Sequence, residues 1–200
     1  MLQINKKRGT GIRSTLLLSA SFVMLSSGMY LLALLSTPMV APYLPVAKID
    51  VDALEQPTVG ENRIIIPKIG VDIAYGEGEE ALDAGAQWRY PERGNPSDGG
   101  NFIVAAHRFT LAPTPQETLV KSPFYHIDKL SVGDQIIIDY EGTRYGYTVN
   151  RIYDVKPTQV EIEAPSKTDK MTLYTCTLSG ASDGRVVIDA TPMGEVKIES

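Results

Sequence analysis

Cysteine and histidine are scarce in this 200-residue sequence, which has one cysteine, Cys176, and two histidines, His107 and His126. A single cysteine cannot form an internal disulfide, which is the usual role of cysteine in exported proteins. An intermolecular bridge, a buried inert thiol and a reactive nucleophile remain as possible roles. So few ligands also argue against a zinc site of the usual ligation.

Acidic residues are absent before Asp50, and residues 14–37 contain no charge of either sign. As a helix, these 24 residues would span about 36 Å, enough to cross a hydrocarbon core of about 30 Å. We therefore predict a transmembrane anchor at 14–37, with the basic tail 1–13 in the cytoplasm. A cleaved signal peptide is the alternative, with a weak cleavage site at Val46-Ala47. Either interpretation places the rest of the chain outside the membrane.

The charge of the exported part is strongly negative. Four of the 19 basic residues precede the anchor and all 24 acidic residues follow it, which leaves a formal charge of −9. Nucleic acid is therefore excluded as a partner, because phosphate binding needs a basic face. No loop has the ligand spacing of a calcium-binding EF-hand. We interpret the acidic surface as a source of solubility.

The exported part divides into two segments. Residues 38–62 contain four prolines and little periodicity, which predicts an extracytoplasmic stalk. Residues 63–200 form one domain, for which short apolar runs separated by turns predict a mainly β fold, a closed barrel or a sandwich. We expect two strands within 63–75, short helices at 79–88 and 122–130, and further strands at 100–107, 133–140, 143–155, 170–178 and 184–192.

Three residues of this domain could form a reactive site. Cys176 ends a strand-like run in "TLYTCTLSG", and Arg185 opens the next run. A hairpin would place the two side by side, where a guanidinium could stabilise an oxyanion. His107 ends the apolar run "FIVAAH", at a strand rim suited to an acid–base group. A nearby imidazole or cation makes a thiol a better nucleophile.

These segments resemble the sortase family over residues 63–193. "TLYTCTLSGASDGRVVIDA" is similar to the sortase signature, a cysteine strand followed nine residues later by an arginine that opens the next strand. "GNFIVAAHR" resembles the histidine segment, although Ala106 stands where glycine is common. "FYHIDKLSVGDQIIIDY" and "IIIPKIGVDIAY" resemble the flanking stretches. The Asp-Pro-aromatic lid motif of many pilus-building sortases is missing from "KIDVDALEQPTVG", which argues against that subclass.

The resemblance implies a closed sortase-type β-barrel of seven to eight strands with one or two short helices. It implies a cysteine transpeptidase that cleaves an LPxTG-like sorting signal and passes the acyl group to an amine on a peptidoglycan precursor or a pilin lysine. By resemblance, Cys176 is the nucleophile, His107 the general acid and base, and Arg185 the oxyanion ligand. Thr175 would assist substrate binding. Some sortases use calcium, but we can assign no calcium ligands and predict no cofactor.

Two other functions remain open. A membrane-anchored cysteine hydrolase would use Cys176 and His107 but transfer the acyl group to water. A non-catalytic β module would keep Cys176 inert and would not bring it together with His107 and Arg185. Other enzyme classes find no support, because the sequence lacks the C-x-x-C, H-E-x-x-H, G-x-S-x-G and P-loop motifs.

Overall fold

The computed structural model describes residues 11–40 and 46–197, which belong to two separate units. The first unit is helix α1 (Gly11–Val40). Its stretch Ser14–Ser36 has a mean hydropathy of 1.8 and is long and apolar enough to cross a membrane. By length and composition α1 is therefore a candidate membrane anchor, although an N-terminal signal sequence would have the same properties.

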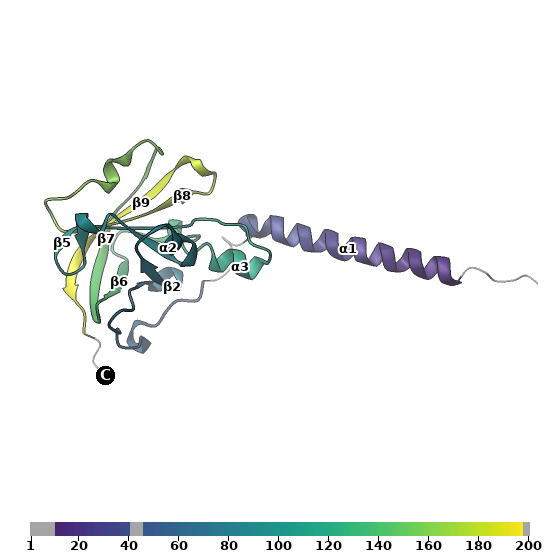
Figure 1. Cartoon of the computed structure of the whole chain (residues 1–200), viewed down its shortest axis with the longest axis horizontal. Helices are drawn as coiled ribbons and strands as arrows, with labels where there is room; N and C mark the ends of the chain where they lie inside the picture. Colours follow the sequence, from purple (N-terminus) through teal and green to yellow (C-terminus); the bar gives the residue numbers. More distant parts are fainter. Residues whose placement is uncertain (1–10, 41–45, 198–200) are drawn as a thin grey trace, which may run out of the picture. The chain divides into compact units, whose positions relative to one another are not determined.

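The second unit is built around a closed β-barrel (Figure 1). The strands are β1 (Arg63–Ile66), β2 (Val71–Gly76), β3 (Ala86–Arg89), β4 (Gly94–Asn95), β5 (Gly99–Ala106), β6 (Gln135–Tyr140), β7 (Thr143–Val155), β8 (Lys170–Thr177) and β9 (Gly180–Glu195). Eight of these described strands follow one another in the order β3-β2-β1-β6-β7-β9-β8-β5, and pairing of β3 with β5 closes the ring. Strand β4 pairs with β5 outside the ring. The predicted mainly β, closed barrel is confirmed.

Helices are short in this unit and occupy the connections. They are the α-helices α2 (Glu79–Ala84) and α3 (Pro115–Val120), and the 3₁₀ helices η2 (Val51–Ala53), η3 (Pro67–Ile69), η4 (Pro91–Arg93), η5 (Ile127–Lys129) and η6 (Val160–Glu163). The side chain of Thr114 accepts a hydrogen bond from the Glu117 N–H and so caps the start of α3. Capping by threonine satisfies one of the free N–H groups at a helix start.

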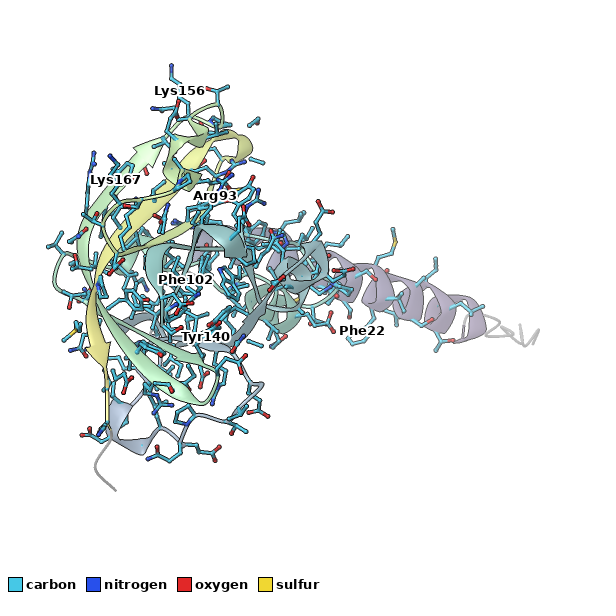
Figure 2. The ribbon with its side chains drawn as sticks, turned by 60° about the vertical axis from the view of Figure 1, so that its left-hand side comes forward. Phe22, Arg93, Phe102, Tyr140, Lys156 and Lys167 are labelled. Carbon is cyan, nitrogen blue, oxygen red and sulfur yellow. The ribbon has the colours of Figure 1, made fainter. Side chains whose placement is uncertain are left out.

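Apolar side chains on alternating positions fill the barrel. Phe102 lies in its centre (Figure 2) and packs edge-on against Tyr75 and Trp88, with ring centroids 5.5 and 5.8 Å away. Val104 and Leu173 are fully buried in the same cluster. The intervening residues of β5 and β8 face outward, because successive side chains of a strand alternate between its two faces. This outer face of β5 and β8 carries the candidate site.

Two sequence predictions of helices need correction. The helix expected at 79–88 ends at Ala84, and Ala86–Arg89 is strand β3. Pairing of this segment with β5 along four residues closes the barrel and outweighs the local helical pattern. The short helix expected at 122–130 is limited to the 3₁₀ turn Ile127–Lys129.

Residues 46–62, which we predicted to be part of a stalk, contact the barrel. The Ile49 N–H donates to the Pro67 carbonyl at 3.1 Å, and Arg144 Nη2 donates to the Glu55 carbonyl at 2.8 Å. Val59 packs so closely on Gly142 that a Cβ there would lie 2.7 Å from its Cγ2. Gly142, with φ +75, closes the hairpin between β6 and β7, where glycine is favoured. The contacts hold this segment against the barrel.

Candidate active site

Cys176 and Arg185 face each other across two neighbouring strands. Cys176 lies near the end of β8, and its Cα partner in the antiparallel β9 is Arg185. The pairing becomes irregular directly after Cys176, between Cys176 and Thr177. Because opposite residues of an antiparallel pair have close side chains, the arginine is held next to the thiol. Cys176 is free and half-buried, so it is open to a substrate.

His107 follows directly after β5, on the other side of the cysteine strand. Strands β5 and β8 are parallel, with Ala105 opposite Tyr174. Two residues further along, this register sets His107 level with Cys176. The imidazole Nε2 lies 3.1 Å from Oδ1 of Asp83, an exposed carboxylate on α2. The ring is thus held by a residue that sequence reasoning missed.

Thr175 links the two strands at this point. Its Oγ1 donates a 2.7 Å hydrogen bond to the carbonyl of Ala106, the residue before His107. Thr175 is only 2% exposed, so the bond is buried. The observed contact fixes β8 to the end of β5, between the histidine and the cysteine.

Replacing Thr175 with valine should therefore destabilise the barrel. The buried Ala106 carbonyl would lose its side-chain donor, at a cost of about 1–3 kcal/mol. Urea unfolding measures the loss. Thr175→Ser keeps the hydroxyl and should lose less, and equal stability of Thr175→Val and the wild type would contradict the prediction.

Arg185 directs its guanidinium to backbone carbonyls at the start of its own strand, β9. Its Nη1 donates to the carbonyls of Ala181 and Gly184, at 2.7 and 2.9 Å. These carbonyls belong to the first residues of β9, which therefore hold the charge at the edge of the site. A substrate oxyanion would compete with neutral carbonyl acceptors for this charge, and charge-assisted hydrogen bonds are the stronger ones.

One pocket of about 320 Å³ contains the predicted residues. Cys176, His107 and Arg185 line it together with Thr175. The rest of its lining comes from α2, from β3, β5 and β8, and from the connection between β7 and β8: Leu82, Gln87, Arg89, Ala105, Ala106, Pro157, Gln159, Val160, Ile162, Glu163 and Tyr174. The lining combines apolar side chains with polar groups that could orient a ligand.

The second histidine lies elsewhere. His126 lines a different pocket, with Leu119 and Val120 of α3. Burial, followed by the nearby positive charge of Lys129, lowers the pKa of His126. The structure therefore separates the two histidines and brings only His107 to the cysteine.

Metal ligands do not cluster in the described part of the chain. Within residues 11–40 and 46–197, no group of three or more histidine, cysteine, aspartate or glutamate side chains is placed to hold a metal ion.

The fold and the site together are a closed β-barrel with a cysteine and an arginine on paired strands and a histidine beside them. The sortase-domain family model matches residues 64–193. The chain belongs to the sortase family, whose members are cysteine transpeptidases.

Individual relatives agree with this assignment. Sortase SrtE1 of Streptomyces coelicolor is 28% identical over 150 residues, a match that covers 66% of this chain and 40% of that protein. The sortase D5 transpeptidase of Clostridium perfringens is 30% identical, with a TM-score of 0.53 over 68% of this chain and 79% of that structure. The SrtA sortase of Actinomyces oris is also 30% identical, with a TM-score of 0.54 over 72% and 86%.

Proposed function

We propose that this chain is a membrane-anchored transpeptidase. It would cleave an LPxTG-like sorting signal on a substrate protein and join that substrate protein to an amine. The observation that carries the proposal is the shared pocket lined by Cys176, His107 and Arg185. The family's chemistry supplies the substrate class. The amine would belong to a peptidoglycan precursor or to a pilin lysine.

The reaction proceeds in two acyl transfers. The Cys176 thiolate attacks the carbonyl carbon of the Thr–Gly bond, and the carbonyl electrons move to the oxygen. Arg185 turns from the carbonyls of Ala181 and Gly184 to this oxyanion. The intermediate then collapses, the C–N bond breaks, and His107 gives its proton to the leaving amine. A thioester with Cys176 remains.

The second transfer reverses these steps with a new amine. His107 takes a proton from the acceptor amine as its nitrogen attacks the thioester carbon. Collapse of the second intermediate expels the Cys176 thiolate and leaves an amide. The enzyme returns to its starting protonation state, so no cofactor is needed to balance the reaction.

We further propose that α1 anchors the chain, with residues 1–13 in the cytoplasm and the barrel outside the cell. Substrates with sorting signals would be held in the same membrane by their own apolar tails. Sharing one membrane raises the effective concentration of enzyme and substrate for each other. The arrangement would place the site near the sorting signals of anchored proteins.

A product assay tests the function. The full-length chain in detergent is mixed with LPxTG-type and LAxTG-type peptides and an oligoglycine amine, and the products are identified by mass spectrometry. We expect an amine-linked product that is absent with Cys176→Ala. Cleavage without amine linkage would favour the hydrolase instead, and no cleavage of either peptide would favour the non-catalytic module.

A further inference from the structure

The outer wall of the pocket is formed by the connection between β7 and β8. Pro157, Val160 and Ile162 of this connection line the pocket. Lys156 and Lys167, near its two ends, project outward in Figure 2. Most of the connection is exposed, and Val160 is 64% exposed. A loop of this kind needs ties to the barrel to keep a fixed shape.

Glu163 is the exception in this connection, because it is only 9% exposed. A buried carboxylate is costly unless it is paired and hydrogen-bonded. Its Oε1 lies 2.9 Å from Arg89 Nε on β3 and accepts a 2.5 Å hydrogen bond from the Tyr174 hydroxyl on β8. The Arg89 N–H does not point along this contact, so the contact is an ion pair rather than an aligned hydrogen bond. One carboxylate thus joins the wall to two strands of the barrel.

Backbone atoms on either side of this carboxylate are tied down as well. Arg93 Nη1 donates to the Glu163 carbonyl. The side-chain amide of Asn101, on β5, donates to the carbonyls of Ile162 and Ala164, at 3.3 and 2.8 Å. Three consecutive residues of the wall therefore bond to η4 and β5. We call Glu163, Arg89, Arg93, Asn101 and Tyr174 the Glu163 latch.

The Arg89 guanidinium contacts side chains of the protein itself. Besides the Glu163 carboxylate, its Nη1 donates to Gln87 Oε1 at 3.2 Å and its Nη2 donates to the Tyr90 hydroxyl at 3.3 Å. Each guanidinium nitrogen thus has a protein partner. The group lines the pocket, but these contacts suit a structural tie better than recognition of a substrate charge.

Tyr174 connects the latch to the reactive strand. It lies two residues before Cys176 on β8, and alternate residues of a strand face the same side. Its ring packs with Ile103, Ala105 and Val187 on the outer face of the barrel, with Ile162 of the wall against that cluster. The latch therefore sets the distance between the β7–β8 connection and strand β8, which carries the Cys176 thiol.

We propose that Glu163 is a positioning residue, which holds the pocket wall at the spacing that the sorting signal needs. The inference rests on the proposed function and deepens it. Glu163 touches neither the thiol nor the imidazole in the described contacts, so it acts through the wall. Its loss should weaken substrate binding and leave the chemical steps intact.

The test compares two glutamate variants of the full-length chain. Glu163→Gln removes the carboxylate charge but keeps the shape. Glu161→Gln is the matched control, since Glu161 lies on the same 3₁₀ helix and is exposed. For Glu163→Gln we expect KM to rise about tenfold with kcat within about twofold, the pattern of lost uniform binding. We also expect faster amide hydrogen exchange in residues 157–164, and neither change in Glu161→Gln.

Each outcome bears on the latch. Unchanged exchange in 157–164 of Glu163→Gln, or faster exchange with an unchanged KM, would overturn the proposal. A wild-type chain that processes no peptide would instead refute the proposed function, while exchange would still report whether the carboxylate holds the wall. If Glu163→Gln does not fold, Arg93→Lys takes its place. That variant keeps the charge but loses the fork-shaped donor, and the same two readouts should change in the same direction.

Discussion

Replacing His107 with glutamine is expected to lower the rate of transpeptidation by about 10²- to 10⁴-fold. Glutamine keeps a polar side chain of similar length but cannot take and return a proton near neutral pH. The proposed reaction uses that proton twice, once for the leaving amine and once for the incoming one. Mass-spectrometric rates with an LPxTG-type peptide and oligoglycine measure the loss.

His126 provides a matched control, because it is the chain's other histidine and lines a different pocket. His126→Gln should keep the wild-type rate within about threefold, as expected for a substitution away from the reacting atoms. Both variants should have similar melting temperatures. Equal loss of activity in the two variants, or full activity of His107→Gln, would contradict the role proposed for His107.

Comparing Arg185 with Asp83 shows why only part of the site could be predicted. Cys176 and Arg185 are nine residues apart, and a hairpin between two strand-like runs brings them together by local geometry. Asp83 meets His107 from α2, 24 residues away, through the closure of β3 onto β5. No short-range pattern marks that contact.

Glu163 was missed for a similar reason. The sequence shows it as one of two acidic residues in "VEIEAP", a stretch with no strong periodicity. Only the folded chain shows that Glu163 is buried while Glu161 is exposed. Arg89 and Arg93 are the partners of Glu163, but they reach it only because the β7–β8 connection folds over β3.

The barrel itself was more predictable, because its strands have strong apolar runs and clear turns. The strands expected at 133–140 and 143–155 are joined by a hairpin at Glu141-Gly142, with both residues at positive φ, 50° and 75°. The start of β3 was not predictable, since "EEALDAGAQW" has good helix formers. Tertiary pairing with β5 decides the conformation of its second half.

Asp139 and Arg144 form a buried pair whose disruption should have the largest effect on stability. The residues face each other on β6 and β7, and their side chains are 1% and 2% exposed. Two hydrogen bonds of 2.6 and 2.7 Å join the guanidinium to the carboxylate. Among the described residues, Nη1 of Arg144 has no hydrogen-bond partner. Asp139 is therefore the carboxylate that compensates the buried positive charge of Arg144.

Asp139→Asn should lower the free energy of unfolding by about 3–5 kcal/mol, because it leaves the Arg144 charge buried without a counter-ion. Urea unfolding of the barrel unit, followed by its single tryptophan, Trp88, measures the change. Asp72→Asn is the matched control. Asp72 pairs with Arg63 across β1 and β2, but the two side chains are 29% and 31% exposed. Exposed pairs contribute about 0–1 kcal/mol, so its removal should matter little.

A second variant separates the buried charge from the lost contact. In Asp139→Leu/Arg144→Met both charges are replaced by apolar groups, which should restore most of the stability lost in Asp139→Asn. Arg144 also holds the Glu55 carbonyl at 2.8 Å, so the double variant should still release residues 46–62 from the barrel. Faster amide exchange in that segment, with near-normal unfolding of the barrel, is the expected combination. If Asp139→Asn lowers the free energy of unfolding no more than Asp72→Asn does, the prediction that an unpaired, buried Arg144 charge destabilises the barrel is wrong.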